Sequence, residues 1–349
     1  MNNMIVCDSY VETGRVYENP DKEKMKMLKK SNIAIKTIAI VGFILLLCAC
    51  SNDANMAKDQ AETKDNKDNS TEIRKVSTVM GEIEVPDRPK RVVVDWYLGQ
   101  VMALGLIPVG APSTLTDYGK FLEPLVSDEM EDIGTEGTVS MEKVLELEPD
   151  LIITWDQEAY ENYAKIAPTI IFDGGSYNSI HEEINAMAEI LNRKDEAKKW
   201  LTEFDQRVDA AKAKIKDVIP EGATFTIADY SMDKNIMIIG DRGERGSTAA
   251  YKLLGLTPSP KVKSDIIDKN QDRVDTSWET VGDYMGDYII SMKSEESDKV
   301  DLPKVWTNLD AVKNNHVYEF DIKKFFNADP LSALYQAEEI ADKLVEGSK

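Results

Sequence analysis

Cysteine and histidine are scarce in this chain of 349 residues, and their positions exclude several kinds of site. The only three cysteines are Cys7, Cys48 and Cys50, so no disulfide can form within the chain after position 50, and no thiolate there can bind zinc. The two histidines, His181 and His316, are too few for a histidine-rich transition-metal site. We therefore expect that no metal is bound directly by the protein.

Basic residues are also in the minority, with 42 Lys and Arg against 63 Asp and Glu and a formal net charge of -21. An acidic surface repels phosphate backbones, which argues against a nucleic-acid partner. The hydrophobic fraction of 42% is typical of a globular protein rather than a membrane bundle or a disordered chain. The length suits one large two-lobed domain or two ordinary domains.

Catalytic motifs are missing as well. The sequence has no Gly-x-Ser-x-Gly elbow, no His-Glu-x-x-His and no phosphate-binding Gly-x-x-x-x-Gly-Lys. Gly240, Gly243 and Gly246 recur every three residues, which is not the dinucleotide fingerprint. The paired acids Glu182 and Glu183 are interpreted as a solvated helix face. The chain is therefore not expected to be an enzyme, and a surface-tethered hydrolase is the distant alternative.

A short apolar run near the N-terminus predicts export. Lys29, Lys30 and Lys36 precede an uninterrupted apolar segment at 38–47, which has the length of a signal-peptide core and is short for a spanning helix. The segment ends in Leu-Cys-Ala-Cys-Ser at 47–51, which resembles a bacterial lipobox with cleavage before Cys50. The resemblance implies that Cys50 carries a lipid. The alternative is an uncleaved anchor helix.

The regions on either side of this segment are expected to lie outside the folded part. Residues 1–24 are too acidic for the start of a signal peptide, so we interpret them as a non-native extension, with translation starting at Met25 or Met27. The signal peptide then spans 25–49. Residues 50–72 are polar with almost nothing apolar, which predicts a flexible tether. The protein is expected at the outer face of the cytoplasmic membrane, held by its lipid alone, and we expect no outer membrane in the organism.

An internal repeat predicts two related lobes. Residues 138–154 and 275–291 align without a gap, and the matching pairs are Ser140/Ser277, Glu142/Glu279, Val144/Val281, Asp150/Asp287 and Ile152-Ile153/Ile289-Ile290. In each copy the serine is expected to cap a short helix, and a turn then leads through the aspartate into a buried strand.

Between the two copies lies an amphipathic segment that predicts a long helix. Its apolar positions follow spacings of three and four from Ala197 to Val218, with Asp195 as the expected cap and Pro220 as the stop. A helix over 195–219 could cross both lobes, at 73–194 and 220–349, or pack within one of them.

Short apolar strands alternate with helical segments elsewhere, which predicts an α/β fold with mainly parallel sheets. The expected strands are at 91–94, 108–110, 151–154, 169–172, 224–227, 288–290 and 316–320. Ligands of such lobes bind beyond the carboxyl ends of the strands. The site is therefore expected in a cleft between the lobes.

Several further motifs follow one another along the chain: Pro89-Lys-Arg-Val-Val-Val94, Ala103-Leu-Gly-Leu-Ile-Pro-Val-Gly110, Pro149-Asp-Leu-Ile-Ile153, Gly240-Asp-Arg-Gly-Glu-Arg-Gly246, Trp306-Thr-Asn-Leu309 and Asp329-Pro330. By the order and spacing of these motifs, the chain from about Val76 to Val345 resembles the iron-siderophore class of ABC-transporter substrate-binding proteins. The resemblance implies two Rossmann-like lobes joined by one long helix. Within the class, residues 240–246 most resemble the ferric-hydroxamate receptors.

The resemblance also implies a function. Such a monomer captures a ferric siderophore, here of hydroxamate type, and delivers it to an ABC importer formed by a permease dimer and its ATPase. It needs no cofactor, because the iron is carried within the siderophore. A haem or cobalamin receptor of the same fold is the alternative.

Ligand contacts are implied residue by residue. Arg245 matches a ligand-contacting arginine of the hydroxamate receptors and Arg242 lies nearby, but Gly243 stands where that subgroup has an aromatic residue. The other candidates follow predicted strands or precede the Asp-Pro pair, and each could equally be a core residue: Trp96, Tyr97, Trp155, Tyr230, Phe325, Phe326 and Asn327.

The repeated glutamates have a second implied role. In this class one glutamate of each lobe docks against arginines of the permease, and these positions correspond to Glu142 and Glu279. The alternative is that each glutamate offsets the dipole of a helix N-terminus.

Overall fold

The computed structural model describes residues 72–126, 129–231, 235–295, 297 and 301–348. The predicted extension, the signal peptide, Cys50 and nearly all of the predicted tether lie outside the described residues. Within the described ranges, no helix combines the length and the apolar character that a membrane crossing requires.

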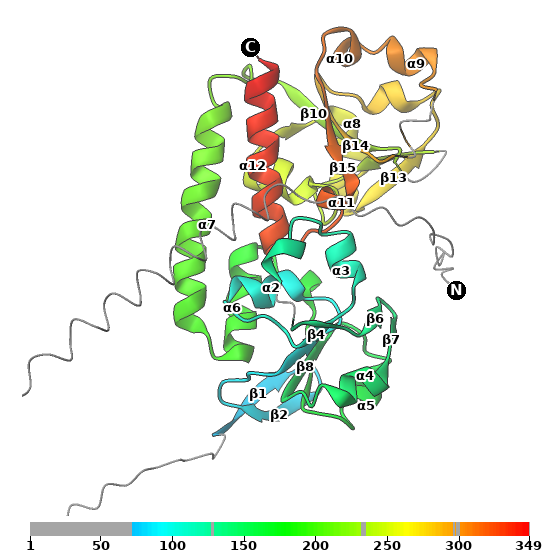
Figure 1. The fold of residues 1–349 in the computed structure, drawn as a ribbon. Helices are drawn as coiled ribbons and strands as arrows, with labels where there is room; N and C mark the ends of the chain where they lie inside the picture. Colours follow the sequence, from blue (N-terminus) through cyan, green and yellow to red (C-terminus); the bar gives the residue numbers. More distant parts are fainter. Residues whose placement is uncertain (1–71, 127–128, 232–234, 296, 298–300, 349) are drawn as a thin grey trace, which may run out of the picture. The chain divides into compact units, whose positions relative to one another are not determined.

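The first half of the described chain forms a parallel five-stranded sheet, and we call this part the N-terminal lobe (Figure 1). Its strand order is β5-β4-β3-β8-β9, and each neighbouring pair is parallel. The strands are β3 (Val92–Val94), β4 (Gly110–Ala111), β5 (Glu131–Asp132), β8 (Leu151–Thr154) and β9 (Thr169–Ile171), with two separate antiparallel pairs, β1 (Ile73–Thr78) with β2 (Gly81–Pro86) and β6 (Gly134–Thr135) with β7 (Thr138–Val139).

Helices cover both faces of this sheet. Successive residues of a strand point to opposite faces, so an apolar strand such as β3 needs a cover on each face. Val92 and Val94 belong to the cluster packed by helices α2 and α6, whereas Val93 belongs to the cluster packed by α4 and α5. The helical elements are α2 (Leu98–Ala103), α3 (Thr114–Asp117), η1 (Glu123–Leu125), α4 (Met141–Glu146), α5 (Tyr160–Tyr163), η2 (Gly174–Ser176) and α6 (Ile180–Leu191).

The second half, the C-terminal lobe, has a mixed sheet in the order β13-β11-β10-β14-β15, with β12 also paired to β10. Strands β10, β14 and β15 are parallel as predicted, but β11 and β13 are antiparallel and the sequence analysis did not identify them. The strands are β10 (Thr224–Asp229), β11 (Ile236–Ile239), β12 (Thr257–Pro258), β13 (Arg273–Thr276), β14 (Tyr288–Lys293) and β15 (Val317–Asp321).

This sheet is also covered on both faces. Ile290 lies in the cluster packed by α12 and η3, and its neighbour Ile289 lies in the cluster packed by α8, α9 and α10. The helical elements are η3 (Thr248–Leu253), α8 (Pro260–Asp265), η4 (Ile267–Lys269), η5 (Val281–Tyr284), α9 (Lys304–Thr307), α10 (Asp310–Lys313), α11 (Ile322–Phe325) and α12 (Pro330–Gly347).

Helix α7 (Lys194–Ile215) joins the two lobes. Its first turns supply Ala197 and Leu201 to the N-terminal core, and its last turns supply Ala211 and Ile215 to the C-terminal core. Its 22 residues span about 33 Å, so the bridging interpretation is correct. The predicted bounds were wrong: the helix starts one residue before Asp195, which is therefore in the first turn rather than the cap, and turns replace it after Ile215.

Helix α12 makes a second connection between the lobes. It lies beside α7 and also packs against α2 of the N-terminal lobe (Figure 1). Its N-cap, Asp329, accepts hydrogen bonds from the backbone N–H groups of Leu331 and Ser332, both at 3.0 Å, and lies directly against Gly99 of α2. A Cβ atom at Gly99 would stand 1.8 Å from Asp329 Oδ1, so this approach of two lobes requires glycine.

The internal repeat corresponds to a real structural equivalence. Asp150 accepts hydrogen bonds from the backbone N–H groups of Lys90 and Arg91, immediately before β3, and Asp287 accepts one from Thr224 at the start of β10. Each repeated aspartate thus fixes the start of its own strand, β8 or β14, beside the first strand of the main sheet of its lobe, β3 or β10.

The repeated serines differ between the lobes. Ser140 caps α4 by accepting from the N–H of Lys143 at 3.3 Å, as predicted. Ser277 does not cap a helix, because a turn follows it and its hydroxyl pairs with that of Thr280 at 3.2 Å.

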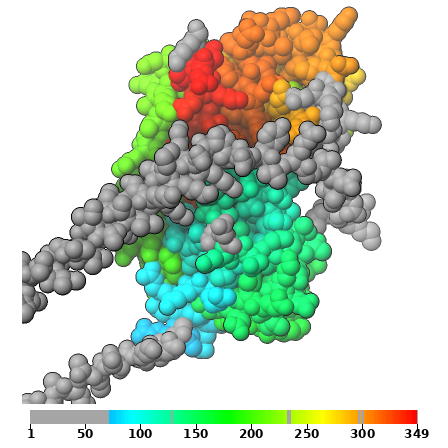
Figure 2. Space-filling model, in the orientation of Figure 1, coloured from blue at the N-terminus to red at the C-terminus, as the bar shows by residue number. Residues whose placement is uncertain are grey.

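Figure 2 shows the lobes in space-filling form, with the cyan and green atoms of the N-terminal lobe below the orange and red atoms of the C-terminal lobe. They touch along a seam, defined by residues 115–121 of the N-terminal lobe and residues 322–335 of the C-terminal lobe. Across it the backbone N–H of Lys120 donates to the carbonyl of Lys323 at 3.0 Å, and the rings of Phe121 and Tyr335 stack at 4.7 Å.

Candidate ligand-binding site

The carboxyl ends of β3 and β8 carry a buried acid that the sequence analysis missed. Asp95 follows β3 and is 4% exposed; it accepts a hydrogen bond from the hydroxyl of Thr154 and one from the backbone N–H of Trp155 at 3.3 Å. Burial raises the pKa of Asp95 to about 6, against the lowering effect of these hydrogen bonds. An aspartate directly after a buried strand was the available sequence signal.

Arg245 lies beyond the carboxyl end of β10 in the C-terminal lobe. Its side chain is 5% exposed, and its Nε donates to Asp229, the last residue of β10. Its Nη1 donates to Glu244 at 2.5 Å, and the guanidinium stands 5.1 Å from the ring centre of Phe326. The predicted arginine is therefore at a strand end, but two carboxylates already neutralise it.

The backbone around this arginine is tightly turned. Arg245 has a φ of +62° and Gly246 one of +75°, and a Cβ at Gly246 would meet the ring of Phe325 at 2.8 Å. The turn therefore needs glycine at 246, and it directs the guanidinium inward between Asp229 and Phe326.

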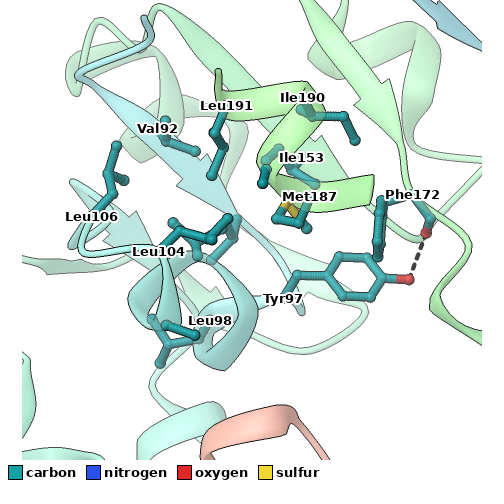
Figure 3. Packing of buried hydrophobic residues seen from close by; sticks show 14 of the residues in the cluster. Val92, Tyr97, Leu98, Leu104, Leu106, Ile153, Phe172, Met187, Ile190 and Leu191 are labelled. Carbon is teal, nitrogen blue, oxygen red and sulfur yellow. Dashed lines mark hydrogen bonds between the residues drawn. The ribbon is translucent and has the colours of Figure 1, made fainter. Parts of the chain in front are cut away.

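Three of the remaining candidates, Tyr97, Tyr230 and Phe325, are buried in the lobe cores. The hydroxyl of Tyr97 donates to the carbonyl of Phe172 at 2.5 Å (Figure 3), and Tyr230 packs edge-on against Trp306.

Trp96, Phe326 and Trp155 are closer to solvent. Trp96 and Phe326 are half-buried, and Trp155, at the end of β8, is 39% exposed. Arg242 is exposed in the turn before Arg245. These side chains are the ones that retain surface for a contact.

Phe326 and Asn327 belong to the seam between the lobes. The ring of Phe326 lies 4.8 Å from that of Tyr118, and Asn327 Nδ2 donates to the carbonyl of Leu115 at 3.1 Å. Asn327 therefore has a structural role, and Phe326 connects the seam to Arg245.

Acidic groups of both lobes approach each other near this arginine. Glu136, in the turn between β6 and β7, is exposed, and its backbone N–H donates to the hydroxyl of Thr114 at 3.3 Å. Desolvation, followed by the charges of Glu244 and Asp95, raises the pKa of Glu136. The charges of Glu244, in the C-terminal lobe, and of Asp95 thus both act on Glu136.

The two repeated glutamates are both on the surface. Glu142 is exposed in the first turn of α4, where a carboxylate suits the helix dipole. Glu279 is exposed in the turn before η5, and a hydrogen bond with Ser277 lowers its pKa. The helix-dipole alternative therefore applies to Glu142 but not to Glu279, which lies outside a helix.

Two observations bear on other kinds of site. Within the described residues, no cluster of three or more His, Cys, Asp or Glu side chains could hold a metal ion. A hollow in the C-terminal lobe is lined by α7 residues such as Ile215 and by Leu254, Leu256 and Phe225. Phe225 is near the amino end of β10, so this hollow is at the wrong end of the strand for a ligand that contacts Arg245.

Comparisons with known proteins agree with this architecture. The chain is 32% identical to the iron(3+)-hydroxamate-binding protein YxeB of Bacillus subtilis over 321 residues, which cover 89% of this chain and 97% of that protein. It is 34% identical to the iron(3+)-hydroxamate-binding protein FhuD of the same organism over 313 residues, covering 87% and 96% of the two chains.

A solved structure gives the same result at the level of the fold. A FhuD fold-family protein of Bacillus subtilis, described as the periplasmic binding protein component of a ferrichrome ABC transporter, superposes with a TM-score of 0.70 at 33% identity. The superposition covers 78% of this chain and all of the other. The model of the periplasmic binding protein family matches residues 97–323, which is more than half of the chain. The two-lobed α/β prediction is confirmed, and the chain belongs to the periplasmic binding protein family.

Proposed function

We propose that this protein captures a ferric siderophore of hydroxamate type outside the cytoplasmic membrane and hands it to an ABC importer. The observation that carries the proposal is the near full-length similarity to two iron(3+)-hydroxamate-binding proteins. The position of Arg245, at a strand end beside the seam between the lobes, supports it.

The chemistry of the ligand fits the residues at the strand ends. In a ferric hydroxamate, oxygens of the siderophore already surround the iron, so the protein needs hydrogen-bond donors and apolar faces rather than metal ligands. Arg245 and Arg242 would supply donors, and Trp96, Trp155 and Phe326 would supply faces. Tyr97, Tyr230 and Phe325 would support this surface from the cores, and Asn327 would hold the lobes together.

Two connections should restrict the motion of the lobes. Helices α7 and α12 both contact the two lobes, and the seam adds a backbone hydrogen bond and an aromatic stack. The unloaded and loaded forms should therefore differ little. The protein would act as a monomer and return its ligand chemically unchanged, without a cofactor of its own.

Delivery would use the exposed glutamates. Glu142 and Glu279 occupy equivalent positions of the repeat, one on each lobe, and each could form a charge-assisted bond with an arginine of the permease. A lipid on Cys50, which lies outside the described residues, would keep the protein at the membrane surface near its transporter.

Titration of tryptophan fluorescence tests the ligand. The chain from Ser51 onward is titrated with a ferric trihydroxamate, a ferric catecholate, haem and cobalamin. Saturable quenching by the trihydroxamate at submicromolar concentration is expected. Binding of haem or cobalamin alone would replace the substrate, and recovery of a chemically altered ligand would favour the hydrolase alternative.

A substitution at Trp155 locates the site. Because Trp155 is 39% exposed at the end of β8, Trp155→Ala should leave the fold intact and weaken hydroxamate binding by about tenfold through loss of an aromatic contact. The matched control is Leu145→Ala, which removes another exposed apolar side chain, on α4. Equal affinity of the two variants would remove Trp155 from the site.

A further inference from the structure

The charges around Arg245 suggest how the site selects among ferric siderophores. Arg245 is the buried cation of this region, and its guanidinium is bonded to both Asp229 and Glu244. Asp229 is fully buried and also accepts hydrogen bonds from the N–H and the hydroxyl of Ser231, at 2.8 and 2.6 Å. Asp229 is therefore a fixed structural partner of the arginine.

Glu244 has a different position from Asp229. Its side chain is 39% exposed while its Oε2 accepts from Arg245, so it adds a second negative charge at the solvent side of the ion pair. Together the two carboxylates give the buried group a net negative charge rather than the net positive charge that one arginine would provide.

The N-terminal lobe adds a further carboxylate from the opposite side. Burial, followed by the negative charges of Glu244 and Asp95, raises the pKa of Glu136. The backbone hydrogen bond from Glu136 to Thr114, which lies at the start of α3 just before the seam, anchors the turn that carries it. Glu136 and Glu244, one from each lobe, therefore both have exposed carboxylate surface in this region.

Ferric siderophores differ in charge according to their donor groups. Three hydroxamate anions neutralise Fe³⁺, whereas three doubly ionised catecholates leave the complex with three negative charges. An anionic complex would be repelled by the uncompensated carboxylates. In a partly desolvated site, water and salt screen this repulsion less than they do in bulk solvent. A pendant ammonium group would be attracted by the same carboxylates.

We propose that Glu136 and Glu244 are specificity-determining residues that make the site prefer neutral or cationic ferric hydroxamates and reject anionic siderophore complexes. This inference depends on the proposed function and narrows its substrate class. Arg245 then donates hydrogen bonds without attracting anions, because the two carboxylates of Asp229 and Glu244 outweigh its single positive charge.

The test compares ferric complexes that differ in net charge. Dissociation constants are measured by tryptophan quenching for ferrioxamine B, a linear trihydroxamate complex with a free ammonium group, and for its N-acetylated form, which lacks that charge. A ferric tris-catecholate serves as the anion. The variants are Glu136→Gln, Glu244→Gln and the double substitution, which keep the shape of the side chains and remove their charges.

The matched control is Glu338→Gln. Glu338 also pairs with an arginine, Arg207, at 2.6 Å, but does so where α12 packs on α7, away from the strand ends. It therefore reports the general effect of removing one acidic charge from an acidic protein.

We expect the wild type to bind ferrioxamine B more tightly than its acetylated form, and the double variant to lose that preference. Affinity for the tris-catecholate relative to the acetylated complex should rise by at least about tenfold in the double variant, and the wild-type preference should shrink at high salt. Unchanged ratios in the double variant, equal to those of Glu338→Gln, would overturn the inference while leaving a hydroxamate receptor. Failure of the wild type to bind either hydroxamate complex would instead overturn the proposed function.

Discussion

Replacing Gly99 by alanine has two physical effects on the free energy of unfolding, and these effects have opposite signs. Gly99 lies inside α2, where helix propensity alone predicts that alanine stabilises the protein by about 1 kcal/mol. The structure predicts the reverse. The new Cβ would stand 1.8, 2.3 and 2.8 Å from Oδ1, Cγ and Cβ of Asp329, so the side chain that caps α12 must move or the lobes must separate.

The magnitude follows from the interactions that are lost. Displacing Asp329 from its hydrogen bonds to the N–H groups of Leu331 and Ser332 costs about 1 kcal/mol, the usual value of an N-cap. Overpacking a well-packed contact adds about 1–3 kcal/mol. After the gain in helix propensity is subtracted, Gly99→Ala should lower the free energy of unfolding by about 1–3 kcal/mol.

Urea unfolding followed by tryptophan fluorescence measures this change, which should appear as a lower midpoint with an unchanged m-value. The control is Gly282→Ala, because a Cβ there meets only Leu309 Cδ2 at an ordinary 3.5 Å. Combining Gly99→Ala with Asp329→Ser, which keeps a capping oxygen on a smaller side chain, should recover part of the loss. If Gly99→Ala were as stable as the wild type or more stable, the close packing of α2 against α12 would be refuted.

Three further predictions concern buried charge and delivery. Burial raises the pKa of Glu183 from 4.5 to about 7, so the folded protein binds this proton more tightly than the unfolded chain does. The free energy of unfolding should therefore fall as the pH rises through that interval. Urea melts at pH 5 and pH 8 measure this decrease, which Glu183→Gln should reduce by about 1–3 kcal/mol. Arg245→Ala leaves the buried carboxylate of Asp229 without its cationic partner, so it should lower the free energy of unfolding by about 3–5 kcal/mol. Adding Asp229→Asn should restore a large part of this loss, and equal stability of the single and double variants would contradict the reasoning. Glu142→Ala with Glu279→Ala should reduce cellular uptake of the ferric siderophore while the dissociation constant stays at the wild-type value, and an equal loss of binding would refute the docking role.

The repeated motif explains why much of the architecture could be predicted. The buried strands at 151–154 and 288–293 are apolar runs with an aspartate before each, and a local pattern of this kind depends little on the rest of the fold. The amphipathic stripe of α7 likewise requires two cores to cover it, one at each end.

Of the two antiparallel strands that the sequence analysis did not identify, β11 (Ile236–Ile239) is an apolar run like the predicted strands, whereas β13 had a weaker signal. The residues of β13 alternate between exposed and half-buried, and its apolar content is a single valine, so nothing local distinguishes it from a loop. The strand conformation of β13 depends on its pairing with β11, which is distant from it in the sequence.

The burial of individual side chains was beyond sequence reasoning for the same physical reason. Glu182 and Glu183 are adjacent in the sequence and were both interpreted as solvated, but α6 turns only Glu183 inward, where Gln100 Nε2 donates to it at 2.8 Å. Helical geometry separates neighbours by about 100° around the axis, and the packing of other elements decides which of them is buried.

The sequence by itself determined the α/β class, the two related halves and the bridging helix, because periodic patterns and a repeat express them locally; Arg245 became a candidate only through the resemblance to a known family. Only the tertiary structure decided that Arg245 is neutralised by Asp229 and Glu244, that Asn327 holds the seam, and that Gly99 must be small for α12 to approach α2. These are contacts between residues far apart in the chain, and their energies depend on distance and burial, which a linear pattern of residue types does not contain.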